Sequence, residues 1–174
     1  MEPQLFQSDL SVAGIIDEGA AGLQTPDRAE CMASSRAVAQ RWYQAFDQHN
    51  PALLQAILAD EWFDIPAPHG QQPGAGGAIQ TLTRLHAAFP DFRIAIRDVL
   101  QDGAKVVVRS EISGTHRGSF LGVPPSGRTI RIQAVDIHEV RNGKVTRTWH
   151  TEDWMSGLRQ IGFFERMATA TESR

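Results

Sequence analysis

Cysteine is nearly absent from this chain of 174 residues, in which Cys31 stands alone. One cysteine excludes an internal disulfide, argues against a cysteine-based metal site and fits a reducing compartment. Histidines and acidic residues show no HExxH-type spacing, so the sequence indicates no metal. Three well-known motifs are also missing, namely a GxxxxGK phosphate loop, a GxGxxG turn after a first strand and a GxSxG nucleophile elbow.

Long apolar runs and long runs of one charge are missing as well. No apolar segment approaches the ~20 residues of a membrane-spanning helix. The formal charge is −3, from 17 basic and 20 acidic residues without a long run of either sign, which argues against binding to nucleic acid or to a membrane surface. Residues 1–19 are acidic where a signal peptide would be basic, and Gly14 interrupts their apolar segment. We therefore expect a soluble, cytoplasmic protein.

Hydrophobic residues make up 41% of the chain, a proportion typical of a globular protein, and the length suits one domain with a substantial core. Residues 1–27 are rich in Gly, Asp and Gln, so we interpret them as an arm that is either flexible or packed on a partner. The domain itself is expected at 28–165, followed by a tail at 166–174.

The periodicity of apolar residues predicts helices in the first half of the domain and strands in the second. Helices are expected at 28–49, in a short segment from Pro51 and at 78–89, with a Pro/Gly-rich loop at 63–77. Strands are expected at 92–100, 104–113, 129–140 and 144–153, with a crossover at 114–128. Helices followed by an antiparallel sheet indicate an α+β fold, and a strongly bent sheet around helices leaves a cavity for a ligand.

The turn of the last hairpin decides which side chains share a face of the sheet, because a slip of one residue inverts every one of them. A two-residue loop at 142–143 sends His150 to the face opposite Asp136, whereas a bulged three-residue loop at 141–143 puts both on one face. We favour the three-residue loop because it gathers apolar side chains on the other face of the hairpin: Val135, Ile137, Val145 and Trp149.

In that register Asp136 and His150 are diagonal cross-strand neighbours with Cα atoms about 7–8 Å apart. A carboxylate beside a histidine fixes the imidazole tautomer and raises its basicity, so His150 would act as general base and acid with Asp136 as its orienter. The structural alternative is that Asp136 only satisfies a buried His150, or that both contact solvent. Asp153 falls on the other face, where we expect a salt bridge with Arg131.

Other polar and aromatic residues are weaker candidates. His116 is interpreted as a hydrogen-bonding loop residue, His138 as an exposed rim residue and His86 as a residue at the edge of the core. His69 either caps the cavity mouth or is an exposed loop residue, and Arg109 is either a buried ion-pair partner or a substrate anchor. Most aromatic residues of the helices and loops are expected in the core, with one or two shaping a pocket: Trp42, Tyr43, Phe46, Trp62 and Phe89.

Three segments carry a resemblance to a known family: FPDF at 89–92, GTHRGSFLGVPPSGR at 114–128 and GKVTRTWHTEDWMSGLRQIG at 143–162. Over roughly residues 30–163 the chain resembles the SnoaL-like polyketide cyclases and ester cyclases, of the nuclear transport factor two-like superfamily. The resemblance implies a conical α+β barrel, in which N-terminal helices pack in a strongly curved mixed or antiparallel sheet (a cystatin-like roll). It also implies a cofactor-free enzyme with a deep hydrophobic cavity.

These cyclases close a ring by an intramolecular aldol reaction, in which an acid/base side chain removes an activated proton. Their two key polar positions fall on Asp136 and His150, where the cyclases carry a histidine and an aspartate respectively, so the two residue types are interchanged here. Asp64 and Ile65 occupy the region where the cyclases present an Asn or His to their ligand before a proline.

We therefore expect a lyase or isomerase that moves a proton on a small or mid-sized apolar carbonyl compound, by aldol cyclisation or isomerisation. The alternatives are water activation, as in an epoxide hydrolase or hydratase, and a non-catalytic small-molecule binding protein. A homodimer through the outer sheet face is expected, and neither nucleic acid nor membrane is an expected partner. Besides the catalytic His150 and Asp136, the expected substrate-binding residues are Trp42, Phe46, Trp62, Asp64, Ile65, His69, Phe89 and His116.

Overall fold

The computed structural model describes residues 28–165 and residue 167, so the expected arm at 1–27 and all but Met167 of the expected tail lie outside the described residues. The helices are α1 (Arg28–Asp47), α2 (Pro51–Ile57), α3 (Gly74–Ala88) and α4 (Trp154–Gln160). The strands are β1 (Leu58–Ile65), β2 (Arg93–Asp102), β3 (Lys105–Thr115), β4 (Thr129–Arg141) and β5 (Lys144–Glu152). None of the described helices has the length and apolar character that crossing a membrane requires.

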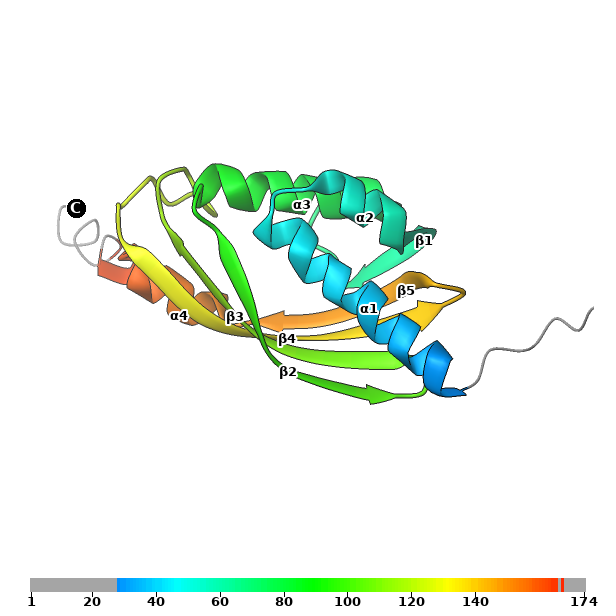
Figure 1. Cartoon of the computed structure of the whole chain (residues 1–174). Coiled ribbons are helices and arrows are strands. Elements are labelled where there is room, and N and C mark those ends of the chain that lie inside the picture. Colours follow the sequence, from blue (N-terminus) through cyan, green and yellow to red (C-terminus); the bar gives the residue numbers. More distant parts are fainter. Residues whose placement is uncertain (1–27, 166, 168–174) are drawn as a thin grey trace, which may run out of the picture.

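The strands form one sheet in the order β1-β5-β4-β3-β2, in which β1 runs parallel to β5 and the other neighbours are antiparallel. Figure 1 shows that this sheet is strongly curved and that α1, α2 and α3 lie on one side of it. Helix α1 contacts β2, β3, β4 and β5, whereas α3 packs against β1 and α2. The predicted α+β class, with helices packed in a curved mixed sheet, is therefore confirmed.

Buried and exposed side chains alternate along β3 and β4, as expected for strands with one face on a core. On β4 the inward side chains are Ile130, Ile132 and Ala134, followed by the polar residues Asp136 and His138. Because side chains alternate along β4, two ionisable groups point into an apolar interior.

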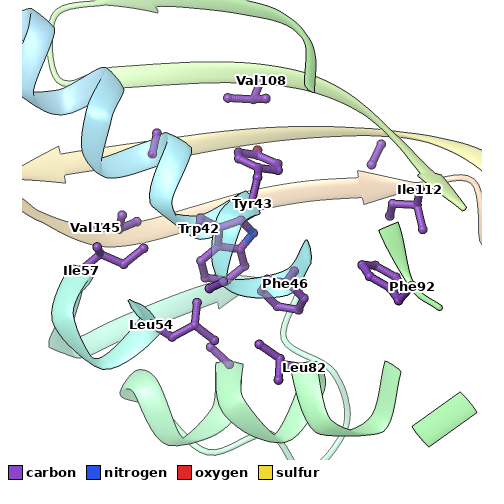
Figure 2. Close-up of a cluster of buried hydrophobic side chains, with 14 of the residues drawn as sticks. Trp42, Tyr43, Phe46, Leu54, Ile57, Leu82, Phe92, Val108, Ile112 and Val145 are labelled. Atoms are coloured by element: carbon purple, nitrogen blue, oxygen red, sulfur yellow. The ribbon is translucent and has the colours of Figure 1, made fainter. Parts of the chain in front are cut away.

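Helix α1 supplies three aromatic side chains of the core. Figure 2 shows Trp42, Tyr43 and Phe46 in the space between the sheet and helices α2 and α3, and their exposed fractions are 9%, 2% and 5%. Leu54 of α2 and Leu82 of α3 are fully buried in the same cluster. Each such side chain contributes roughly 1.5–3 kcal/mol when it leaves water, so these contacts hold α1 over the sheet.

Two short elements, β1 and α4, were not predicted. In β1 the register against β5 shifts between Leu58 and Phe63, so burial does not alternate along the strand and no period of two is visible. Helix α4 has seven residues, too few to show a helical period. It begins after Asp153, whose side chain accepts a hydrogen bond from the Ser156 N–H at 3.0 Å. Helix α3 also begins earlier than predicted, at Gly74.

The last hairpin differs from the predicted one. Asn142 and Gly143 have positive φ angles of 50° and 71° and form a two-residue turn. The predicted three-residue loop is therefore wrong, and the extra residue is Thr146 in β5, where the register shifts. Beyond this bulge Asp136 pairs directly with His150. The prediction that these two residues share a face is confirmed, but they lie directly opposite each other rather than diagonally.

The bulge also turns Val145 into the core, where it is 0% exposed, so its predicted place on the outer face is wrong. Val135, Ile137 and Trp149 remain on the outer face of the sheet, and Lys105 Nζ lies 5.2 Å from the centroid of the Trp149 ring. Dimerisation through this face stays a prediction.

Two predicted ion-pair roles change as well. Arg131 Nη1 lies 2.6 Å from Glu111 Oε1, so the predicted bridge between Arg131 and Asp153 is wrong, because Asp153 caps α4 instead. Arg109 pairs with Asp98 at 2.6 Å on the exposed surface, so this arginine is neither buried nor part of the cavity wall.

Two adjacent glycines of α3 differ in the space around them. A Cβ on Gly77 would overlap the carbonyl oxygen of Gln72, whereas a Cβ on Gly76 would meet nothing within 4 Å. We expect Gly77→Ala to lower the free energy of unfolding by about 1–3 kcal/mol, because the turn before α3 must shift. Gly76→Ala should raise it by roughly 0.5 kcal/mol, because alanine favours a helix. Urea unfolding followed by circular dichroism measures both, and equal changes would contradict this packing.

Candidate active site

A cavity of about 230 Å³ lies between the inward face of the sheet and the helices α1 and α3. Three acidic residues and a histidine reach it from neighbouring strands, with Asp64 on β1, Asp136 on β4, and His150 and Glu152 on β5. An apolar cavity with a few convergent polar groups is the default place for a ligand site. Its aromatic and aliphatic walls are formed mainly by Trp42, Phe46, Leu85, Phe92, Ile94, Ile112, Phe120 and Trp154.

The structure brings several predicted site residues together around this cavity, namely Trp42, Phe46, Asp64, Asp136 and His150. Five others do not line it: Trp62, Ile65, His69, Phe89 and His116. Phe89 still supports the wall, because its ring packs against that of Phe120 with 5.1 Å between centroids. His116 Nδ1 lies 3.1 Å from Ser126 Oγ, in keeping with its predicted role as a hydrogen-bonding loop residue. His69 is an exposed loop residue.

The His150 ring is surrounded by hydrogen-bond acceptors. Nδ1 lies 2.9 Å from Glu152 Oε2, and Nε2 lies 3.0 Å from the Pro66 carbonyl oxygen and 3.2 Å from Asp64 Oδ1. A carbonyl and an ionised carboxylate only accept, so both ring nitrogens carry a hydrogen. Burial lowers the pKa of His150, but the hydrogen bond with Glu152 and the charges of Glu152 and Asp64 outweigh it and raise the pKa to about 9. His150 is therefore an imidazolium at neutral pH.

The Asp136 carboxyl faces His150 across the hairpin, and Cβ atoms of such directly paired residues are about 4.5–5.5 Å apart. Asp136 is 5% exposed, and its Oδ2 accepts a hydrogen bond from the Tyr43 hydroxyl at 2.7 Å. Burial raises the pKa of Asp136 to about 7, although the Tyr43 hydrogen bond and the His150 charge act in the opposite direction. At neutral pH both forms of the carboxyl are populated, which suits a group that accepts and returns a proton.

Two further carboxyl groups surround His150. Gln71 Nε2 donates to Asp64 Oδ2 at 3.0 Å, and burial raises the pKa of Asp64 while the His150 charge opposes the rise. Glu152 lies two residues after His150 and so on the same face of β5. The negative charges of Glu152 and Asp64 favour the protonated form of His150. The same charges raise the pKa of Asp136, because they disfavour a further negative charge nearby.

A chain of buried hydrogen bonds continues from Asp136 behind the cavity wall. Tyr43 Oη lies 3.0 Å from His138 Nε2, His138 Nδ1 lies 3.1 Å from Thr148 Oγ1, and Trp62 Nε1 donates to Thr148 Oγ1 at 3.0 Å. His138 is 0% exposed, so its predicted place on an exposed rim is wrong, because α1 covers this part of the hairpin. Burial, and after it the charge of His150, lowers the pKa of His138 to about 3, so the ring is neutral.

Sequence reasoning missed Glu152 and the Tyr43 hydroxyl as parts of the site. A signal was available for Glu152, because strand alternation places it on the same face as His150. Tyr43 was expected in the core, where it lies, but no local pattern indicates that its hydroxyl meets Asp136 across the interior.

The arrangement is a weak acid beside a fixed positive charge in an apolar cavity. Asp136 can accept and return a proton, and the imidazolium of His150 can stabilise negative charge that develops nearby. Within residues 28–165, no group of three or more His, Cys, Asp or Glu side chains is arranged to hold a metal ion.

Comparison with known proteins gives a consistent result. A family model described as SnoaL-like polyketide cyclase matches residues 37–161. TsrD from Streptomyces laurentii is 25% identical with a TM-score of 0.70, over 75% of this chain and 96% of that one. Wild-type IdmH from Streptomyces antibioticus is 26% identical with a TM-score of 0.66, over 74% and 98% of the two chains. A comparison with curated proteins finds no match.

We expect NMR titration of the full chain to show His150 doubly protonated at pH 7, with a pKa of about 9. Glu152→Gln removes the charge beside Nδ1 and should lower the pKa of His150 by about one unit or more. Glu61→Gln changes an exposed glutamate of β1 and should leave the titration of His150 as it is. A neutral His150 ring in the unmodified chain at pH 7 would contradict the hydrogen bonds described above.

Proposed function

The chain belongs to the family of SnoaL-like polyketide cyclases, and from this premise we propose that it moves a proton on a small or mid-sized apolar carbonyl compound without a cofactor. The observation that carries the proposal is the Asp136 carboxyl, with a pKa raised to about 7, opposite the imidazolium of His150 in an apolar cavity. Burying these groups costs stability, and enzymes accept such costs where a group must change its protonation state.

Asp136 is the general base in this proposal. It takes a proton from a carbon next to the substrate's carbonyl group; the C–H bond breaks, its electron pair stays on the substrate as an enolate, and an O–H bond forms on Asp136. In an aldol cyclisation the enolate carbon then bonds to a second carbonyl carbon, and Asp136 returns the proton to the resulting alkoxide. In an isomerisation the proton returns to a different carbon. Either outcome agrees with a lyase or isomerase.

His150 stabilises the enolate in this proposal and does not act as the base, which reverses the roles expected from the sequence. Both ring nitrogens already carry hydrogens, which are held by Glu152, Asp64 and the Pro66 carbonyl. A positive charge that is fixed before the substrate binds lowers the energy of a nearby enolate oxygen without reorganisation. Removal of one such group commonly costs a factor of about 10²–10³ in rate.

The walls and the charges of the cavity restrict the substrate. Aromatic rings such as those of Trp42, Phe120 and Trp154 favour an apolar ring or chain. The negative charges of Asp64 and Glu152 are balanced in the lining by the positive charges of His150 and Arg84, so the cavity offers little surplus charge to bind a charged substrate. We therefore infer a neutral ketone, with a second carbonyl group where the reaction is a cyclisation.

Hydrogen exchange on a simple ketone tests this proposal without the natural substrate. In D₂O the unmodified chain should accelerate exchange of the C1 hydrogens of 2-tetralone, a neutral bicyclic ketone, as followed by proton NMR. Asp136→Asn should reduce the protein-dependent exchange by about 100-fold or more, because the general base is lost. The exchange rate should rise as Asp136 ionises through about pH 7 and fall as His150 loses its charge near about pH 9.

Asp98→Asn provides the matched control, because Asp98 is an exposed aspartate of β2 that pairs with Arg109. This variant should exchange 2-tetralone at the unmodified rate. Undiminished exchange by a folded Asp136→Asn variant would overturn the proposal. Hydrolysis of styrene oxide with solvent oxygen-18 in the diol would instead favour the water-activating alternative.

A further inference from the structure

Asp136 is one end of a buried chain of four hydrogen bonds whose other end is Trp62. The bonds join Trp62 to Thr148, Thr148 to His138, His138 to Tyr43 and Tyr43 to Asp136, at donor–acceptor distances between 2.7 and 3.1 Å. All five side chains are 5% exposed or less. Figure 2 shows the Tyr43 side chain directed from α1 toward the strands of the sheet, and its hydroxyl links the helix to Asp136 of β4.

The chemistry of the two ends fixes the direction of every hydrogen bond in this chain. An ionised Asp136 only accepts, so the single hydrogen of Tyr43 Oη points to Oδ2. Nε2 of His138 must then donate to Tyr43, which leaves Nδ1 of the neutral ring as an acceptor for the Thr148 hydroxyl. Thr148 Oγ1 in turn accepts from the Trp62 indole, which can only donate. Each donor in the chain has its acceptor.

The opposite direction leaves a buried hydrogen without a partner. If Asp136 carried a proton on Oδ2 and donated it to Tyr43, Tyr43 would donate to His138 Nε2, and His138 would shift its hydrogen to Nδ1. Thr148 Oγ1 would then accept from both His138 and Trp62, and its own hydroxyl hydrogen would have no acceptor in the chain. A buried donor without an acceptor is disfavoured, so the chain opposes protonation of Oδ2.

We propose that Trp62, Thr148, His138 and Tyr43 are positioning residues that keep Oδ2 of Asp136 an acceptor and so direct the transferred proton to Oδ1. Asp136 lines the cavity, and its Oδ1 makes no hydrogen bond within the described part of the chain. This inference rests on the proposed role of Asp136 as the general base. It adds that four buried residues, which do not react themselves, determine which oxygen of Asp136 accepts the proton.

Other ionisable groups face Asp136, and none of them replaces Tyr43 as a hydrogen-bond donor to it among the described residues. Strand β3 contributes the apolar Val108 opposite Asp136. The ionisable groups around Asp136 are Tyr43 on α1, Asp64 on β1, Arg84 on α3, His138 on β4, and His150 and Glu152 on β5.

The tautomer of His138 shows in which direction the hydrogen bonds between Trp62 and Asp136 point. Its measurement requires no substrate. We expect ¹⁵N NMR of the labelled full chain to show neutral His138 with its hydrogen on Nε2 at every pH between about 5.5 and 9. The tautomer should stay the same while the ¹³C resonance of the Asp136 carboxyl titrates near pH 7. A change to the Nδ1–H tautomer as Asp136 takes up its proton, or an Nδ1–H tautomer throughout, would overturn the proposal.

Two variants separate this role from simple packing. Tyr43→Phe cuts the chain beside Asp136, so the pKa of Asp136 should rise by about one unit or more, and part of the His138 population should shift its hydrogen to Nδ1. Thr148→Ser keeps a hydroxyl at the same place and should preserve both the tautomer and the pKa of Asp136. An unchanged tautomer and pKa in a folded Tyr43→Phe variant would contradict the proposal. Because no ketone is involved, a failure here is distinct from a failure of 2-tetralone exchange.

Discussion

The pairing of Asp136 with His150 depends on one extra residue in β5. Thr146 is unpaired between Val145 and Arg147, and this bulge shifts the remaining residues of β5 by one position against β4. Without the bulge, the two-residue turn would pair Asp136 with Trp149 and turn His150 to the outer face of the sheet. The bulge therefore brings a carboxyl group and an imidazolium together inside the cavity and leaves the tryptophan outside.

The ionisable groups of the site make the free energy of unfolding depend on pH. The pKa of Asp136 is raised to about 7. The free energy of unfolding therefore falls as pH rises from about 4 through about 7, because the buried carboxyl ionises less readily than the same group in the unfolded chain. The pKa of His150 is raised to about 9, so the stability that its ion pairs contribute is fully present below about pH 6.5 and is lost as pH rises through about 9. Both effects make the fold less stable in alkaline solution. Only the first follows from placing a carboxyl group among apolar walls.

The sequence was sufficient where one face of a strand is buried and insufficient where distant elements meet. Alternation along β3 and β4 predicts the sheet and the inward place of Asp136, because burial of one face imposes a period of two. A bulged turn and a bulge in the strand each add one residue, so the shared face of Asp136 and His150 was predicted although the turn was wrong. The protonation of His150 was not predictable in the same way. It depends first on Glu152, which alternation along β5 places on the same face, and then on Asp64 and the Pro66 carbonyl, which lie at and just beyond the end of the unpredicted strand β1.

The interchange of residue types, relative to the pattern of the family that the sequence resembles, is matched by the neighbours of each position. Position 150 is surrounded by acceptors, namely Glu152, Asp64 and the Pro66 carbonyl, so a protonated histidine satisfies them where a third carboxylate would be repelled. Position 136 receives a hydroxyl hydrogen from Tyr43, which the Asp136 carboxylate accepts at Oδ2. Asp64 acts in the same direction as Glu152, because it supplies part of the negative charge that keeps His150 protonated. The neighbours of positions 136 and 150 thus suit the residue types that this chain carries there.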